Sequence, residues 1–289
     1  MSTEALGRGS SVAWDDSFEH VLEPTHGLGA LRLPELISFR ELLYFLTWRD
    51  IKVRYKQTAL GVIWAILQPV LAMILFSIVF SDVAKISSQG VPYPIFSYCA
   101  LVPWLFFANS VQLSSLSLTL NPNLITKVYF PRVYVVTSPI LASLVDFALA
   151  SVILIGLMIY YSVAPRGVGV ILLVPLLLLA LMTTFGVSAW LAALNVKYRD
   201  VRFAVPFMIQ VWMFASPVVY SVAALPAAWR DVYGLNPMST VIEGFRWALV
   251  GTPPPSAGSV LLSVLTGLII FVGGLLYFNR TERRFADIV

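Results

Sequence analysis

Long apolar stretches separated by short polar segments fill most of the chain after residue 60. There are six of them, and each is at least about as long as the roughly 20 residues that a helix needs to cross a bilayer core. They are continuous, which is typical of helices, whereas the strands of a membrane barrel are shorter and alternate. The pattern therefore predicts an all-α integral membrane protein with six transmembrane helices. We place them at Gly61–Ser81, Pro94–Leu120, Val135–Val163, Val168–Leu194, Phe203–Val222 and Ala257–Phe278.

The composition agrees with a membrane protein. Of the 289 residues, 58% are hydrophobic and 12% are charged, whereas soluble domains carry about 25% charged residues. The single cysteine, Cys99, lies inside a predicted span, so the chain forms no disulfide within itself. Both histidines, His20 and His26, lie in the polar N-terminal tail. We therefore expect no catalytic residue and no metal site in this chain.

Lys and Arg residues gather on one side of the predicted spans. The positive-inside rule assigns the richer side to the cytoplasm, and an even number of spans then places both termini there. The cytoplasmic group is Arg8, Arg32, Arg40, Arg49, Lys52, Arg54, Lys56, Lys127, Arg132, Lys197, Arg199, Arg202, Arg280, Arg283 and Arg284. The outer group is Lys85, Arg166, Arg230 and Arg246.

Two segments precede the six-span domain, which we place at residues 58–289. Residues 1–33 have no apolar stretch behind a basic start, so they predict a flexible cytoplasmic tail and not a signal peptide. Residues 34–57 predict an amphipathic interface helix in the headgroup layer. Such a helix is either a plain anchor that sets topology or an anchor that also contacts a partner. Its apolar face would carry Tyr44, Trp48, Ile51 and Tyr55, beside a basic stripe of Arg49, Lys52 and Lys56.

Two short basic loops connect predicted spans. Residues 121–132 read NPNLITKVYFPR, and residues 195–202 read NVKYRDVR. The dipeptide Asn121-Pro122 predicts the end of one helix and a new turn after it. Taken alone, both loops are explained by the positive-inside bias.

The connection Ala223–Ser256 is longer than a structureless loop is expected to be, and it is too short to cross the bilayer twice. It predicts two short helices, Pro226–Tyr233 and Pro237–Val250, that re-enter the outer leaflet. Non-helical backbone at membrane depth usually lines a pathway, although a surface cap with no transport role is the alternative. In this outer gate, at about residues 225–250, we single out Trp229, Tyr233, Asn236, Pro237, Glu243 and Arg246.

The chain carries no sequence motif for nucleotide hydrolysis, because both the phosphate-binding loop and the dinucleotide fingerprint are missing. Asp146 is the clear ionisable residue within the spans, whereas ion-coupled carriers need several such groups and two matching halves. Energy for transport must then come from a partner. Asp146 either lines a wet channel, or faces a basic group at its cytoplasmic mouth, or pairs with hydroxyl groups of a neighbouring span.

Four segments together resemble one family. TWRDIKVRYKQTALGVIWAILQPVLAMILFSIVF, NLITKVYFPR, NVKYRDVR and LNPMSTVIEGFR, in this order, resemble the membrane subunit of polysaccharide-exporting ABC transporters. This type-2 exporter class carries lipid-linked O-antigen, capsule or teichoic-acid chains. The resemblance runs from about residue 35 to the end of the chain. It implies a homodimer in the cytoplasmic (inner) membrane with two copies of a separate ATPase subunit, which would bind ATP and Mg. It implies no cofactor on this chain and no nucleic acid.

The resemblance also implies roles for particular residues. The loop at 121–132 would be a coupling helix seated in the ATPase, with the interface helix at the same contact. The coupling residues would be Asn123, Leu124, Ile125, Thr126, Lys127, Val128, Tyr129, Phe130 and Arg132. The pyrophosphate of the lipid carrier would meet cations at the cytoplasmic rim, and the candidates are Arg49, Lys52, Arg54 and Lys56.

A polysaccharide needs a wet channel, and aromatic side chains offer flat apolar faces to the C–H faces of sugar rings. Single aromatic residues near span ends are otherwise explained by the interfacial belt. The small polar residues Ser114, Ser115, Ser117 and Thr119 of the second span either line the conduit or pack between helices. The channel-lining candidates are Trp64, Tyr98, Trp104, Phe106, Phe107, Asp146, Trp212, Phe214 and Tyr220.

Three other functions compete with this interpretation. A secondary carrier or flippase would work without ATP, and a membrane-bound transferase would need grouped acids, whereas Asp50, Asp200 and Asp231 are isolated in the sequence. An ABC exporter of drugs or small lipids would share the architecture. Only the aromatic content and the family resemblance argue against the last.

Overall fold

The computed structural model describes residues 37–56, 61–127, 130–230 and 232–282, and the regular structure in these ranges is helical throughout. The predicted N-terminal tail lies outside them. The helical membrane architecture predicted from the sequence is confirmed, because five helices in the described ranges are long and apolar enough to span a bilayer. These are α3 (Val62–Phe76, continued by the π-helix η2, Ser77–Val83), α4 (Tyr93–Leu120), α6 (Val133–Tyr160), α7 (Gly167–Lys197) and α11 (Ala257–Glu282).

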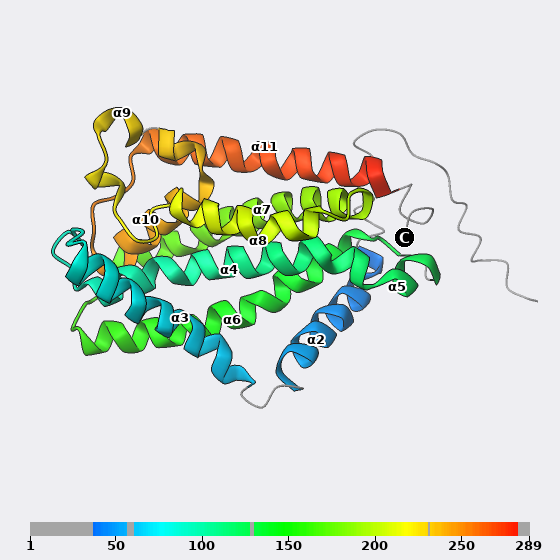
Figure 1. The fold of residues 1–289 in the computed structure, drawn as a ribbon, viewed down its shortest axis with the longest axis horizontal. Helices are drawn as coiled ribbons and strands as arrows, with labels where there is room; N and C mark the ends of the chain where they lie inside the picture. The colour runs from blue at the N-terminus through cyan, green and yellow to red at the C-terminus, as the bar shows by residue number, and fades with distance from the viewer. Residues whose placement is uncertain (1–36, 57–60, 128–129, 231, 283–289) are drawn as a thin grey trace, which may run out of the picture. The chain divides into compact units, whose positions relative to one another are not determined.

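Shorter helices lie at the two ends of this bundle, whereas α8 (Val201–Phe214) runs along it (Figure 1). We call the end that carries α5 (Pro122–Lys127) the α5 end, and the opposite end, which carries α10 (Pro237–Val250), the α10 end. The dipeptide Asn121-Pro122 separates α4 from α5, as the sequence predicts. The shorter elements are α2 (Arg40–Lys56), α5 (Pro122–Lys127), α8 (Val201–Phe214), η3 (Val222–Ala224), α9 (Ala227–Arg230), η4 (Val232–Leu235) and α10 (Pro237–Val250).

The fifth predicted span is shorter than expected. Instead of Phe203–Val222, the structure has α8, which ends at Phe214 after 14 residues. At about 1.5 Å per residue this helix measures about 21 Å, less than the roughly 30 Å of a bilayer core. The chain turns directly afterwards, where the carbonyl groups of Pro217, Val218 and Tyr220 accept hydrogen bonds from the Arg246 side chain.

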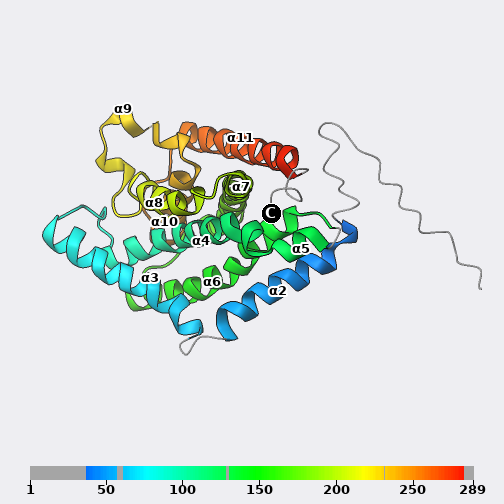
Figure 2. The same cartoon turned by 45° about the vertical axis from the view of Figure 1, so that its right-hand side comes forward.

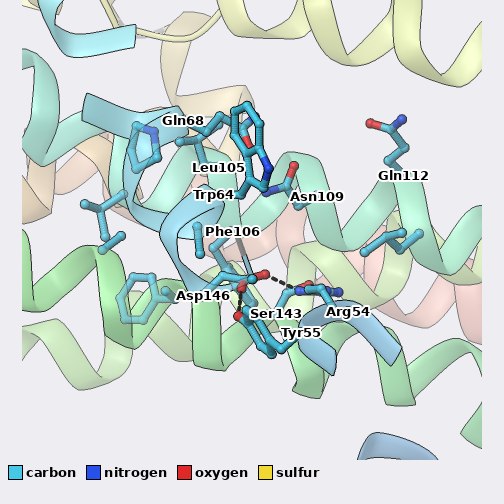
Figure 3. Close-up of a pocket in the computed structure, with 17 residues that line it drawn as sticks. Arg54, Tyr55, Trp64, Gln68, Leu105, Phe106, Asn109, Gln112, Ser143 and Asp146 are labelled. Atoms are coloured by element: carbon cyan, nitrogen blue, oxygen red, sulfur yellow. Dashed lines mark hydrogen bonds and ion pairs between the residues drawn. The ribbon is translucent and has the colours of Figure 1, made fainter. Parts of the chain in front are cut away.

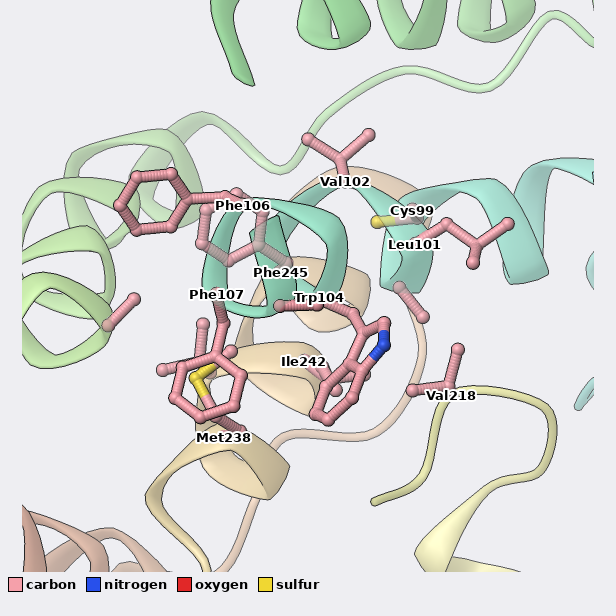
Figure 4. Packing of buried hydrophobic residues seen from close by; sticks show 14 of the residues in the cluster. Cys99, Leu101, Val102, Trp104, Phe106, Phe107, Val218, Met238, Ile242 and Phe245 are labelled. Carbon is pink, nitrogen blue, oxygen red and sulfur yellow. The ribbon is translucent and has the colours of Figure 1, made fainter. Parts of the chain in front are cut away.

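Helix α4 runs through the middle of the bundle, between α6, α7, α8 and α10 (Figures 1 and 2). Most of its residues are buried, whereas nearly all residues of α3 are at least partly exposed. Trp104 and Phe107 of α4 pack against Met238 and Ile242 of α10 in the main apolar core (Figure 4). Helix α10 is therefore held against the central helix by burial of its apolar face.

Glycines allow α7 and α11 to touch through their backbones. A Cβ atom on Gly274 would lie 2.2 Å from the carbonyl oxygen of Gly186, and one on Gly186 would lie 2.7 Å from the backbone of Ile270. Close approach at small residues is a common way for membrane helices to associate. Substituting either glycine would force α7 and α11 apart.

Helix α2 lies against the α5 end and follows part of α6 (Figure 2). Its Leu46 is buried in a second apolar cluster together with Ile125 and Phe130. The apolar face predicted for this helix is divided between exposed and bundle-facing residues. Tyr44 and Trp48 are exposed, whereas Tyr55 faces the bundle and its hydroxyl bonds to Asp146. Docking on α6 explains this division, since a helix on a protein surface buries only the residues that meet it.

Candidate functional site

A partly open cleft of about 390 Å³ lies between α3, α4 and α6, with the end of α2 at its border. Trp64 and Gln68 of α3 and Asn109 of α4 lie on one side of it (Figure 3). Arg54 and Asp146 lie opposite. The cleft brings several polar side chains next to α3, a helix that is otherwise apolar and at least partly exposed along most of its length.

Asp146 is the charged centre of this cleft. It is the fourteenth of the 28 residues of α6, so it sits at the helix midpoint. Its two carboxylate oxygens accept hydrogen bonds from Arg54 and from the hydroxyl of Tyr55. Ser143, less than one turn earlier on α6, lies 3.5 Å from the Arg54 guanidinium. The carboxylate thus lines the cleft and faces a basic group of α2.

The environment of Tyr55 keeps its phenol protonated. Burial is the main cause that raises the pKa of Tyr55, and the neighbouring Asp146 carboxylate adds to it. A neutral phenol donates its proton to a carboxylate, whereas a phenolate would repel it. The cluster therefore joins one carboxylate, one guanidinium and one neutral hydroxyl.

Sequence reasoning missed three amide side chains in the cleft. Gln68 on α3 and Asn109 and Gln112 on α4 line it, and Gln68 and Gln112 are exposed. In the described part of the chain, none of the three is hydrogen-bonded to another residue. The sequence did contain a signal for them, because amide side chains are uncommon in apolar spans. Asn109 and Gln112 also follow the i, i+3 spacing of one helix face.

The four rim candidates do not form one group. Arg49 binds Asp50 and the side chain of Asn121, and Arg54 binds Asp146. Lys52 and Lys56 are exposed, with the Lys52 ammonium 5.4 Å from the Trp48 ring centre. Two of the four cations are thus committed to contacts within the chain.

Half of the aromatic channel candidates, all of them on α4, are buried inside the bundle. Tyr98, Trp104, Phe106 and Phe107 are at most 2% exposed, because α4 is enclosed by its neighbours. Among them Phe106 borders the cleft, and the ring of Phe107 packs 5.0 Å from the ring of Trp212.

Three aromatic candidates lie closer to the surface. The exposed fractions of Trp64 and Phe214 are each 52%. The Tyr220 hydroxyl donates to the carbonyl of Phe214. Of the two aromatic candidates that border the cleft, Trp64 and Phe106, Trp64 is thus by far the more exposed.

The predicted coupling segment begins with α5. Asn123 and Lys127 are exposed, and Leu124 is partly buried. The side chain of Thr126 and all of Val128 and Tyr129 lie outside the described residues. Ile125 and Phe130 are buried beside Leu46 of α2, and Arg132 bonds to Glu282 at the end of α11. The segment is thus anchored on one face and exposed on the other.

Arg246 is the buried polar centre of the α10 end. It is 2% exposed and donates to the carbonyl groups of Phe96, Pro217, Tyr220 and Val218 at 2.6 to 3.1 Å. Burial lowers the pKa of Arg246 to about 10, so the guanidinium stays charged at neutral pH. Its predicted neighbour on the same helix, Glu243, instead accepts a hydrogen bond from the backbone of Val222.

The remaining outer-gate residues tie α8 to α10. Asn236 caps α10 by accepting from Met238, and it also bonds to Trp212 and Ser216. Tyr233 contacts the hydroxyl of Tyr220 at 2.7 Å. Pro237 occupies the first turn of α10, where proline is favoured, and Trp229 is exposed. In place of one helix at Pro226–Tyr233, the structure has two separate short elements, α9 and η4.

This arrangement, a helical membrane bundle with a central buried helix, short end helices and a polar cleft, is that of a membrane transport subunit. Residues 41–250 match the ABC-2 type transporter family. The chain therefore belongs to this family and is a multi-pass transporter component, not an enzyme. In such transporters ATP is bound by a separate subunit.

Relatives with assigned names agree with this class. The chain is 28% identical over 256 residues to the O-antigen export system permease protein RfbA of Myxococcus xanthus, covering 88% of this chain and 97% of the relative. It is 29% identical over 251 residues to a protein of the same name from Klebsiella pneumoniae, covering 86% and 95%. It is 21% identical over 238 residues to the polysialic acid transport protein KpsM of Escherichia coli, covering 81% and 91%.

Proposed function

We propose that the chain exports lipid-linked polysaccharide, of the O-antigen, capsule or teichoic-acid type, across the inner membrane. Two copies would work with two copies of an ATP-binding subunit. The observation that carries the proposal is the cleft beside α3, which has amide groups and an ion pair among its lining residues, in a subunit of this family. A polar polymer is costly to place in hydrocarbon without hydrogen-bonding partners, and this cleft offers such partners along an apolar bundle.

The α5 end faces the cytoplasm in this proposal, with both termini on that side. Lys127, Arg132, Lys197 and Arg202 all lie at or near this end. Such an excess of basic residues marks the cytoplasmic face of membrane proteins. The exposed face of α5 is then available to the ATP-binding subunit.

Coupling would pass from α5 to the cleft through α2. Arg49 of α2 bonds to Asn121, the residue at the break between α4 and α5, at 3.2 Å. Five positions later on the same helix, Arg54 bonds to Asp146 in the cleft. A displacement of α5 would therefore be transmitted to the cleft by one short helix, α2. Packed helices move as rigid units in other conformational transitions as well.

The exposed cations of α2 are the remaining candidates for the phosphate groups of a lipid carrier. Lys52 and Lys56 extend from α2 into the surroundings of the bundle, and an ammonium near the membrane surface attracts phosphate. At the other end, α10 and the turn after α8 would form the outer gate, since Asn236 and Arg246 bind both.

The test is transport in sealed vesicles that contain this chain with or without its ATP-binding subunit. Polysaccharide movement that needs both the subunit and ATP supports the proposal. Equal movement without ATP would identify a secondary carrier or flippase. Movement of small lipids or drugs without any movement of polysaccharide would identify the other kind of ABC exporter.

A further inference from the structure

The charges in the cleft cancel. Among the residues described there, Arg54 and Asp146 are the two charged ones, and they form an ion pair with each other. Their side chains are 24% and 17% exposed, so solvent screens the pair only in part. The cleft therefore presents a net charge of zero to anything that enters it.

The rest of the polar lining is neutral and able both to donate and to accept. Gln68, Asn109 and Gln112 each offer an amide NH₂ and an amide oxygen, and these side chains are not bonded elsewhere in the described chain. Trp64 adds an aromatic side chain to the lining, and the residue is 52% exposed. Hydroxyl groups need both donors and acceptors, and the C–H face of a sugar ring packs on an aromatic face.

A polyanion would fit this lining poorly. Each carboxylate of an acidic sugar would lose hydration on entering the cleft and would meet the Asp146 carboxylate. The cation that would offset this cost, Arg54, is already neutralised by Asp146. Amides solvate a hydroxyl group well but do not compensate a charge.

We infer, on the basis of the proposed function, that the cleft takes a neutral polysaccharide and not a polyanionic one. The named relatives include both an O-antigen permease and a polysialic acid transport protein, so family membership alone does not decide between these classes. The ligand contacts assigned to the site are the face of Trp64 and the amides of Gln68, Asn109 and Gln112.

The experiment measures binding to the chain in lipid nanodiscs together with its ATP-binding subunit. The probes are end-labelled dextran and oligosialic acid of equal length, compared by fluorescence anisotropy at physiological salt. The expected result is binding of dextran at least about fivefold tighter than oligosialic acid. Gln112→Leu should weaken dextran binding by about fivefold, since about one hydrogen bond of roughly 1 kcal/mol is lost.

A matched control is available on another helix. Gln210 of α8 is exposed and lies outside the cleft lining, so Gln210→Leu should leave dextran binding unchanged. Gln112→Lys should shift the preference toward oligosialic acid, whereas Gln210→Lys should not.

Several outcomes would overturn the inference. Oligosialic acid bound as tightly as dextran, or more tightly, would refute the neutral class and leave polysaccharide export standing. Binding of neither probe by a complex that still transports polysaccharide in vesicles would refute the cleft as the sugar site. A complex that transports no polysaccharide at all would refute the proposed function itself.

Discussion

Asp146 and Arg54 show how a chain places charge within an apolar bundle. A carboxylate at the midpoint of a spanning helix is costly unless it is paired, and here a guanidinium and a phenol hydroxyl both bind it. The partners come from α2, which lies outside the spans. The pair therefore stabilises the contact between α2 and α6 as well as the charge itself.

Replacing one member of the Arg54–Asp146 pair should lower the free energy of unfolding more than replacing both members. Asp146→Asn leaves the Arg54 guanidinium partly buried without its counter-charge, so the free energy of unfolding should fall by about 1–3 kcal/mol. Adding Arg54→Gln should recover most of this loss. Thermal unfolding of the two single variants and the double variant in detergent measures the coupling. If the loss in the double variant equals the sum of the losses in the two single variants, a direct interaction between Arg54 and Asp146 is contradicted.

Arg246 holds four carbonyl groups with one side chain. Arg246→Met should lower the free energy of unfolding by at least about 3 kcal/mol, because several buried carbonyl groups lose their donor. Arg246→Lys should also lower the free energy of unfolding, since an ammonium group cannot direct hydrogen bonds to all four carbonyl groups as a planar guanidinium does. The measurement is thermal unfolding in detergent.

The control for this prediction is Arg230, an exposed arginine that also donates to two carbonyl groups, those of Leu225 and Ala223. Arg230→Met should cost less than about 1 kcal/mol, because its acceptors can bind water instead. Equal losses at Arg230 and Arg246 would show that burial is not the source of the effect.

At the scale of elements, α2 is a brace between α5 and α6. Arg49 reaches Asn121 beside α5, and Asp50 accepts from Ser138 of α6 at 2.7 Å. Both contacts lie on the face of α2 that carries the buried Leu46. Movement of α5 without α2 would break these bonds.

Arg49→Ala should therefore uncouple hydrolysis from transport. We expect polysaccharide moved per ATP to fall several-fold while the ATP-binding subunit still associates. Arg49→Ala combined with Asn121→Ala should be no worse than either change alone, because both remove the same bond. Arg40→Ala, which removes another exposed cation of the same helix, is the control and should leave the ratio unchanged. A fall of the same size in Arg40→Ala would point to charge, and not to the Arg49–Asn121 bond.

The elements that could be predicted are those set by local pattern. Apolar length identified the spanning helices, and Asn236-Pro237 identified the start of α10, where the Asn236 side chain caps the helix. The end of α8 could not be predicted, since apolar residues continue past Phe214 and the turn depends on Arg246, which lies 32 positions after it in sequence. Contacts between distant segments leave no periodic signal.

The same limit applied to the candidate site. Asp146 was identified because charge is rare in a span, but its partners on α2 could not be named. The amides escaped notice because neutral polar residues often only pack between helices. The aromatic residues of α4 were singled out by chemistry, whereas their burial follows from the central position of that helix.

For the whole molecule, the uneven distribution of basic residues predicts one orientation. In vesicles or intact cells, Lys127→Cys should react with a membrane-impermeant maleimide only from the cytoplasmic side, and Trp229→Cys only from outside. Both side chains are exposed at opposite ends of the bundle. The native cysteine, Cys99, is buried, so the unsubstituted chain is the unlabelled control. The reverse pattern would invert the proposed roles of α5 and α10.

The shortness of α8 has a consequence for the surrounding lipid. A helix of about 21 Å beside a hydrocarbon layer of about 30 Å creates a mismatch, which a membrane relieves by thinning locally or by letting protein cover the gap. Acyl chains next to α8 would then be compressed or disordered. Lipids with longer tails raise the cost of that deformation, so the thickness of the host membrane becomes one of the variables that set how readily this transporter works.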